Sequence, residues 1–263
     1  MNLVYATELT HNQWQVLEPL LPAAKSTGRP RSVSLMLVIQ AILYVLVTGC
    51  AWRLLPKTYP PYSTVYYYFR QWRDDGNWKR IHDALFEQVR LAARRHPSPS
   101  AASLDSQSIP TAVMVHEAVG YDGAKQIKGR KRFTLVDTLG LLMAVHVVGA
   151  NVPERAGAKQ LLSKVNQERE RFPRLARIWV DRGFSGEDFM RWVIDAFRWI
   201  LDTVLRPQGA EDFVLLPKRW VVERTYGWLH WYRRLNVDYE HLPTSSEALI
   251  HIAMIRLMLR RLA

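Results

Sequence analysis

The chain has 263 residues, with 36 Lys and Arg against 24 Asp and Glu, so its formal net charge is +12. Apolar residues make up 48%, enough for a packed core, and the single cysteine, Cys50, excludes a disulfide framework or a thiolate metal cluster. Neither a signal peptide nor an apolar run long enough to span a bilayer is recognisable, so we expect a soluble protein of a reducing compartment with no membrane partner.

Residues 1–96 are predicted to form an all-helical domain. Thr10 and Gln13 fit a capping box at the start of a first helix. A second helix is expected over Ser34–Thr48, where Gly49 ends it, and a third from Thr64 to about Asp75, with Ser63 as its cap.

The third helix carries arginines and aromatic residues. Helical spacing turns Val65, Phe69 and Trp72 toward the core and leaves Arg70 and Arg73 outward. Such a helix resembles the DNA-reading helix of a helix-turn-helix domain. The same periodicity also fits a small helical cap whose aromatic residues only pack, so periodicity leaves both interpretations open.

Residues 97–103 are small, polar and broken by proline, which predicts a linker. Beyond it, short strands and helices alternate, so residues 104–263 are predicted to form a mixed α/β domain. The expected elements are a hairpin of Phe133–Asp137 and Leu141–Val148, a helix over Ala156–Val165, a strand over Ala176–Asp181, a helix capped by Ser185 that runs to Val193, strands over Trp199–Leu205 and Phe213–Leu216, a helix opened by Pro217, and a last helix over Ser245–Leu262 with a capping box of Thr244 and Glu247.

Basic residues gather in one short stretch, which we expect to be a loop: Lys125, Lys128, Arg130, Lys131 and Arg132. Together with the net charge, this cluster favours nucleic acid as the partner. Charge alone is also compatible with a basic protein that binds no nucleic acid.

Three acidic residues could carry chemistry. Asp105 follows a short apolar approach, Asp181 closes the predicted strand RIWV, and Glu223 lies inside the helix opened by Pro217. Converging carboxylates repel one another unless cations hold them, and a pair of Mg²⁺ ions can clamp a phosphodiester. The three acids therefore form a candidate site for phosphodiester chemistry.

Spacing does not choose among the acids, because Asp137 and Asp202 also end apolar runs, and Glu223 could simply pair with Arg219 four residues earlier. Other chemistries lack their motifs. The chain has no HExxH, no GxxxxGK[ST] and no GxSxG, so we expect no zinc site, no nucleotide cofactor and no serine nucleophile.

Several long motifs resemble bacterial insertion-sequence transposases of the DDE type, insertion-sequence-five (four/five) group. The N-terminal ones are LTHNQWQVLEPLLP, GRPRSV, ILYVLVTGCAWRLLP and PYSTVYYYFRQWRDDGNWKRIHDAL. Further along the chain the resemblance continues through LDSQSI, GYDGAKQIKGRKRFTLVDTLGLLMAV, ANVPERAGAKQLL, WVDRGF, LPKRWVVERTYGWLHWYRRL and SSEALIHIAMIRLMLRRL.

The resemblance implies a ribonuclease-H-like catalytic core behind a helix-turn-helix-like domain. It assigns catalysis and the binding of two Mg²⁺ ions, with Mn²⁺ as a substitute, to Asp105 in LDSQS, Asp181 in WVDRG and Glu223 in VVERT. The implied activity is cleavage at the terminal inverted repeats of an insertion sequence and strand transfer to target DNA, by a homodimer on DNA in the bacterial cytoplasm, at the nucleoid.

The related signature has an arginine four residues before the glutamate, and Arg219 fits it. Two further signature positions, ordinarily tyrosine and lysine, hold Leu216 and His230 here. The expected DNA-binding residues are Arg70, Arg73, Lys125, Lys128, Arg130, Lys131, Arg132, Arg219, Arg224, His230, Arg233 and Arg234. The alternatives are a non-catalytic DNA-binding protein derived from a transposase, and a ribonuclease-H-like nuclease that does not join strands.

Overall fold

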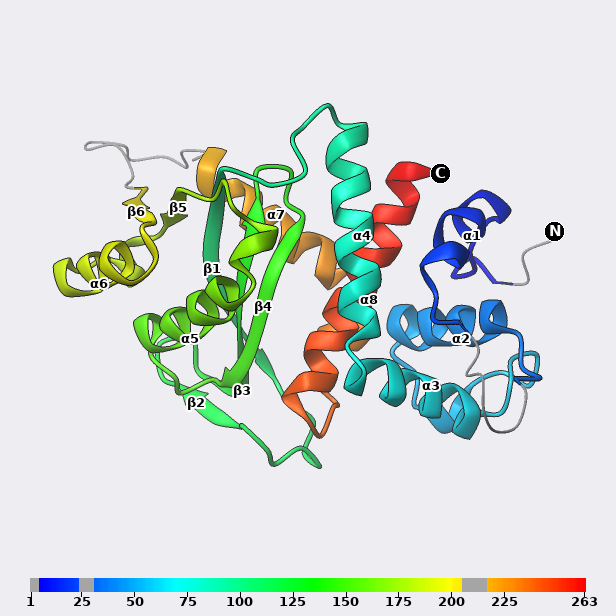
Figure 1. Ribbon diagram of the computed structural model, residues 1–263. Helices are drawn as coiled ribbons and strands as arrows, with labels where there is room; N and C mark the ends of the chain where they lie inside the picture. Colours follow the sequence, from blue (N-terminus) through cyan, green and yellow to red (C-terminus); the bar gives the residue numbers. More distant parts are fainter. Residues whose placement is uncertain (1–4, 24–30, 205–216) are drawn as a thin grey trace.

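The computed structural model describes residues 5–23, 31–204 and 217–263 (Figure 1). Its N-terminal part is helical, as expected. The elements are α1 (His11–Leu17), the 3-10 turn η1 (Glu18–Leu20), α2 (Leu35–Thr48), η2 (Trp52–Leu54), α3 (Tyr62–Asp74) and α4 (Asn77–Ala92). None of the helices in these described ranges is long and apolar enough to cross a membrane.

In this part of the chain, the predicted start of α1 and the predicted ends of α2 are confirmed and the predicted cap of α3 is wrong. The box at Thr10 and Gln13 is formed, and α2 begins after Ser34 and ends at Gly49, whose φ of 72° suits glycine. The expected cap at Ser63 is wrong. Helix α3 begins two residues earlier, at Tyr62 behind Pro61, which has no side-chain donor or acceptor to offer.

A six-stranded mixed sheet forms the centre of the C-terminal part and confirms the expected α/β core. Its strands are β1 (Ala101–Pro110), β2 (Gly120–Asp122), β3 (Ile127–Asp137), β4 (Leu142–Gly149), β5 (Arg177–Val180) and β6 (Ile200–Thr203). Strand β3 pairs antiparallel with β1, β2 and β4, whereas β5 runs parallel to both β1 and β6. The predicted hairpin is β3–β4, and residues 101–103 of the predicted linker belong to β1.

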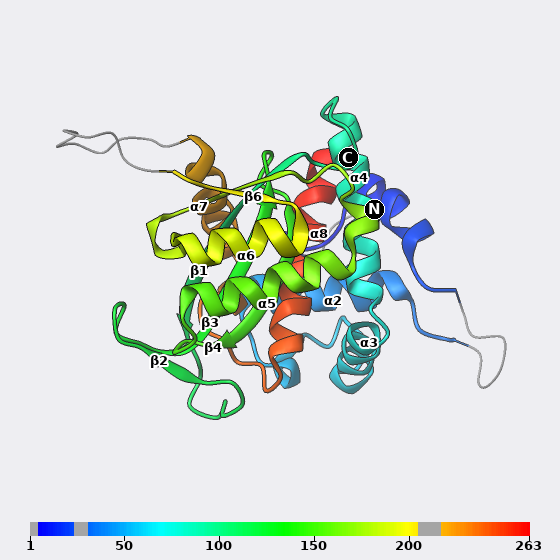
Figure 2. The same ribbon diagram turned by 60° about the vertical axis from the view of Figure 1, so that its left-hand side comes forward.

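Helices cover both faces of the sheet (Figure 2). They are α5 (Glu154–Gln167), α6 (Glu187–Phe197) and α7 (Pro217–His230), with the short turns η3 (Arg169–Arg171), η4 (Arg182–Phe184) and η5 (Arg233–Leu235) between elements. On β3, Phe133 lies against Gly157 of α5, and the next residue, Thr134, donates to the Tyr226 hydroxyl of α7 at 2.7 Å. Consecutive strand residues point to opposite faces, so α5 and α7 lie on opposite sides of the sheet.

The last helix, α8 (Pro243–Leu262), joins the two parts of the molecule (Figure 1). It packs against α4 and β4 and also contacts α1, α2 and α3. The expected capping box of Thr244 and Glu247 is wrong, because Glu247 instead accepts the backbone N–H of Val147 in β4 at 2.9 Å. Ser185 likewise donates to the Arg182 carbonyl, and α6 begins after Gly186. The predicted strand Phe213–Leu216 lies outside the described residues.

A buried ion pair ties α4 to the β3–β4 hairpin. Arg90 of α4 contacts the carboxylate of Asp137, and both side chains are at least 95% buried. The other carboxylate oxygen of Asp137 accepts the backbone N–H groups of Leu139 and Leu141 in the turn of the hairpin. Asp137 therefore shapes the turn and anchors it to the helical part.

We predict that Asp137→Asn lowers the free energy of unfolding by about 3–5 kcal/mol, because it leaves the buried Arg90 charge without its partner. Urea unfolding followed by circular dichroism measures the change. Asp202→Asn is the matched control, since Asp202 pairs with Arg177 at the surface, with 36% and 49% of the two side chains exposed, and should cost at most about 1 kcal/mol. Equal losses in the two variants would contradict the structural role of Asp137.

Candidate active site

Two aspartates meet where β1 and β5 run side by side. The parallel register pairs Ala101 with Arg177 and Ser103 with Trp179. The same offset, continued beyond the paired residues, places Asp105 level with Asp181. The proximity of two carboxylates that are far apart in the sequence is thus a consequence of strand register.

The charge of Asp181 acts on the pKa of Asp105, so the two carboxylates interact electrostatically. Burial raises the pKa of Asp105 from 3.8 to about 7, and the charge of Asp181 adds to this rise, against the lowering effects of the Ser106 backbone N–H, Arg219 and Lys125. The Asp181 carboxylate accepts the backbone N–H of Gly183 at 2.8 Å. Neither aspartate forms an ion pair with any residue in the described ranges.

One face of β1 is directed at α7. Alternate residues of the strand lie along this helix: Ser103 donates to the Lys218 carbonyl at 2.5 Å, and the Gln107 amide lies 3.1 Å from the His230 ring. Asp105, between them, faces the same helix. It also raises the pKa of Tyr226 on α7, a smaller effect than that of Tyr226's own burial. Helix α7 therefore brings Glu223 to the side of the sheet that carries Asp105.

Glu223 is not joined to the two aspartates. Its carboxylate lies 3.4 Å from the guanidinium of Arg219, and 44% of its side chain is exposed. No three acidic or histidine side chains within residues 5–23, 31–204 and 217–263 lie close enough to hold one metal ion. The expected cage of three carboxylates is therefore not assembled in this structure, and the helical ion pair that the sequence offered as the alternative for Glu223 is formed.

The aspartate pair itself fits a divalent cation. Two carboxylates that are not paired with any basic residue in the described ranges, one of them with its pKa raised to about 7, form an oxygen donor set whose mutual repulsion a divalent cation would relieve. Asp137 and Asp202, which the sequence left as competitors, are instead paired with Arg90 and Arg177. Geometry thus separates Asp105 and Asp181 from the other strand-end acids.

Most of the predicted basic loop is a buried strand, so that expectation is wrong. Arg130, Lys131 and Arg132 lie in β3 and are almost fully buried. Arg130 binds the Asp238 carboxylate and the Glu240 and His241 carbonyls, and Arg132 binds the side chain of Gln107. Because their donors are used inside the protein, these side chains are not available to DNA. Lys125 and Lys128 remain exposed.

The remaining predicted DNA-binding residues divide in the same way. Arg234 is buried against Glu240, while Arg224 donates to the Leu139 carbonyl and stacks on Trp228. Arg70, His230 and Arg233 are exposed. Leu216 lies outside the described residues.

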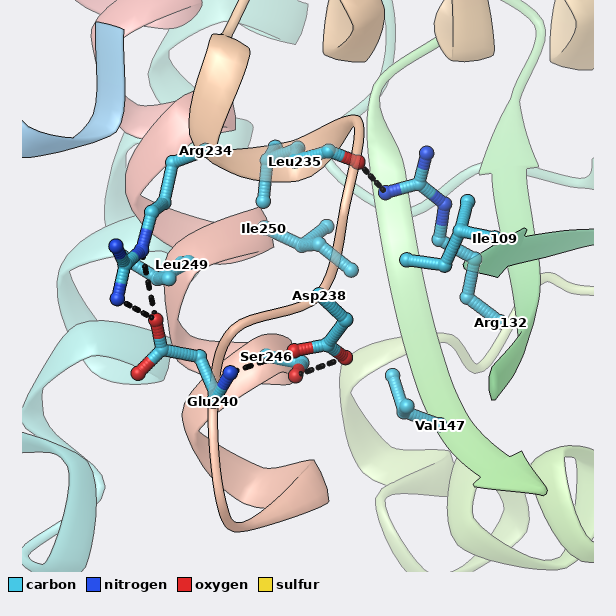
Figure 3. Close-up of a pocket in the computed structure, with 10 residues that line it drawn as sticks. All are labelled: Ile109, Arg132, Val147, Arg234, Leu235, Asp238, Glu240, Ser246, Leu249 and Ile250. Carbon is cyan, nitrogen blue, oxygen red and sulfur yellow. Dashed lines mark hydrogen bonds and ion pairs between the residues drawn. The ribbon is translucent and has the colours of Figure 1, made fainter. Parts of the chain in front are cut away.

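A small cavity beside the buried arginines is not a ligand site (Figure 3). Arg132 and Arg234 line it from opposite sides, with Asp238 and Glu240 between them. Its volume is about 10 Å³, roughly the threshold for one water molecule. The candidate site is therefore not this cavity but the region beyond the carboxyl end of β5, where Asp105 and Asp181 lie level.

Sequence reasoning missed Glu154 at the start of α5. Its carboxylate accepts the Ser106 hydroxyl at 2.6 Å and lies 3.2 Å from the Lys131 ammonium group. Ser106 points to the face opposite Asp105, so Glu154 fixes β1 from behind. An acidic residue in the first turn of a helix is ordinarily explained by the helix dipole, so the sequence carries no signal for this contact.

Comparison with known proteins yields matches along most of the chain. A family model described as "Putative transposase of IS4/5 family" matches residues 9–82, and one described as "Transposase DDE domain" matches residues 96–258. The "Insertion element IS402 uncharacterized 16.2 kDa protein" of Burkholderia cepacia is 37% identical over 103 residues, 36% of this chain and 68% of the relative. The "Putative transposase for insertion sequence element IS402" of the same organism is 30% identical over 133 residues, 49% of this chain and 60% of the relative. The chain thus spans less than two thirds of the second relative.

We predict that the Asp105 carboxyl makes stability fall with rising pH in metal-free buffer. Between its ordinary pKa of 3.8 and about 7, the folded protein keeps a proton on Asp105 that the unfolded chain has released. This group's contribution to the free energy of unfolding therefore declines through that window, by at most about 1.4 kcal/mol per pH unit.

Urea unfolding with EDTA at a series of pH values tests this expectation. Asp105→Asn should flatten the profile and should be more stable than the unmodified protein at about pH 8. Asp202→Asn is the control, because it removes a surface carboxylate that is paired with Arg177 and so tests whether the loss of any carboxylate flattens the profile. Parallel profiles for Asp105→Asn and the unmodified protein would show that Asp105 titrates normally.

Proposed function

Because the chain belongs to the DDE transposases of the IS4/5 family, we propose that it binds the terminal inverted repeats of an insertion sequence and catalyses metal-dependent DNA cleavage and strand transfer. The observation that carries the proposal is that Asp105 and Asp181 lie level on neighbouring parallel strands and interact electrostatically, unpaired with any basic residue of the described ranges, inside the region matched by the DDE domain.

In this proposal Asp105 and Asp181 hold Mg²⁺, and Glu223 completes the set from α7. Bound there, Mg²⁺ supplies Lewis-acid activation of the attacking oxygen and neutralises charge on the scissile phosphate. Glu223 must exchange its contact with Arg219 for this role. Arg219, which already lowers the pKa of Asp105 by its charge, is then free to stabilise a non-bridging phosphate oxygen.

The proposed reaction needs no covalent protein intermediate. Water attacks the phosphodiester at the end of the element and releases a 3′-hydroxyl. This hydroxyl then attacks a phosphodiester of the target DNA in line and displaces the 3′-oxygen of the target strand, which leaves as a hydroxyl. Both steps gain most of their rate from positioning and charge stabilisation. Two ends must be processed together, so we propose a homodimer on DNA.

We predict that Asp105→Asn and Asp181→Asn each lower cleavage of a supercoiled donor plasmid in Mg²⁺ by more than about a hundredfold, the scale of losing one charge-stabilising group from an active site. Binding to the DNA ends should persist, because both side chains act on the reaction. Gel analysis of plasmid nicking and an electrophoretic mobility shift measure the two properties separately.

Asp202→Asn is the matched control, since it removes another carboxylate at the carboxyl end of the sheet and should cut normally. Normal cleavage by Asp105→Asn would refute the assigned site. DNA binding without any cleavage by the unmodified protein would favour the non-catalytic alternative. Cleavage without joining of a pre-cut end would favour a simple nuclease.

A further inference from the structure

A polar pocket of about 280 Å³ opens at the junction between the N-terminal helices and the segment that leads into α8. Helix α3 contributes Arg70 and Arg73, and the C-terminal segment contributes Arg234, Glu240 and Ser245. Three arginines against one glutamate give the lining an excess of positive charge. Aromatic rings, among them Tyr66 and Tyr239, form part of its wall.

Not all of this charge is available to a ligand. Arg234 is held by Glu240 through two hydrogen bonds of 2.8 and 2.6 Å, so the two buried side chains neutralise each other. Arg73 donates to the Ser245 hydroxyl at 2.6 Å and pairs with Asp74.

Arg70 differs from both. It is exposed, its guanidinium lies 6.0 Å from the centroid of the Tyr66 ring, and it forms no ion pair with any residue of the described part of the chain. Among the arginines that line this pocket, Arg70 is thus the one without an ionic partner in the described part of the chain.

The first turn of α8 also contributes positive electrostatic potential to the pocket. No side chain caps this 20-residue helix, whose N-cap residue is Leu242, and Ser245 in its first turn lines the pocket. Pro243 has no backbone N–H, and the N–H groups of Ser245 and Ser246 donate to the Leu242 carbonyl, so it is the positive end of the helix dipole that favours an anion here. Both the arginines and the helix terminus therefore select a negatively charged ligand.

We propose that this pocket binds a phosphate group of the DNA backbone, with Arg70 as the contacting cation and Arg73 positioned by Ser245 beside it. The inference rests on the proposed function, because it takes DNA as the ligand. It makes the DNA-binding surface a composite one. Arg73 and Ser245 are separated by 172 positions in the sequence, so a phosphate held here contacts the helical part and the closing helix together.

The pocket is not formed by α3 alone, because the C-terminal segment supplies part of its lining. The expectation that Arg73 points outward is wrong, since only 11% of its side chain is exposed and it crosses to α8. A DNA strand that reaches Arg70 must therefore run past the N-terminus of α8. This path distinguishes the pocket from a helix that reads DNA by itself.

The test is the salt dependence of binding to a fluorescent, mixed-sequence DNA duplex, measured by anisotropy over a series of KCl concentrations. Arg70→Ala should weaken binding and make the slope of log K against log[KCl] less negative by about 0.9, the value of one lost phosphate contact. Arg70→Lys should restore most of the slope, because it keeps the charge.

Arg80→Ala is the matched control. Arg80 is also an exposed helical arginine, but it lines a different cleft, in which Lys79 and Arg171 are paired with Asp83 and Glu87 adds a further negative charge. Its removal should leave the slope unchanged. An equal change in the Arg70 and Arg80 variants would mean that only the net charge matters, and would overturn the pocket.

Ser245→Asp provides a second, independent variant. Ser245 is buried, with only 4% of its surface exposed, so the new carboxylate must pair with Arg73, and the thermal midpoint checks that the variant keeps its fold. The same carboxylate occupies the place of the phosphate and should reduce DNA affinity severalfold. Unaltered affinity in a folded Ser245→Asp protein would contradict the proposal.

The possible results distinguish failure of the phosphate pocket from failure of the proposed function. Normal DNA binding by the unmodified protein, with an unchanged slope in Arg70→Ala, overturns the pocket and leaves the proposed function intact. Absence of any DNA binding by the unmodified protein overturns both. Inorganic phosphate serves as the last probe: if it raises the thermal midpoint through Arg70 while the DNA slope ignores Arg70, the pocket is a small-anion site and not part of the DNA path.

Discussion

The burial of Arg130 is the constraint on which the arrangement of the two parts depends. Its guanidinium lies inside the protein and binds the Asp238 carboxylate, the Ser246 hydroxyl, and the carbonyls of Glu117, Glu240 and His241. A buried arginine is tolerated only when its donors are satisfied, so β3 holds the segment before α8 in one conformation. That segment in turn supplies the C-terminal wall of the arginine-lined pocket and sets the direction of the closing helix.

From this anchor, the structure links the candidate catalytic centre with the proposed DNA path. Strand β1 is central to the sheet: it pairs with β3, which carries Arg130, and with β5, which leads to Asp181. Helix α7 crosses β1 with Glu223 and Arg219, and the chain then continues through η5 into the pocket segment and α8. The aspartate pair and the pocket are therefore connected through consecutive packed elements of the same chain.

The predicted elements show which local sequence patterns form the expected structure. The hairpin around Gly140 and the helix opened by Pro217 formed as expected, because a positive φ and a fixed φ are properties of those residues themselves. Caps were less reliable. Glu247 fitted a capping box by spacing but reached a strand N–H instead, and Ser185 bonded backward to Arg182. A side chain with several possible partners is decided by whichever group the fold brings near.

The sequence alone determined the mixed α/β class, the helical start of the chain and, through its long motifs, the transposase family. It also contained Asp105, Asp181 and Glu223, but their relations depend on strand register and helix packing, which act between residues far apart in the chain. Only the tertiary structure placed Asp105 level with Asp181. It also paired the competing acids Asp137 and Asp202 with Arg90 and Arg177, and Glu223 with Arg219. Burial divided the basic residues in the same way. Arg130, Lys131 and Arg132 are buried in β3, whereas Lys128 at the start of this strand and Lys125 before it are exposed, because charge is a property of the residue and solvent access is a property of the fold.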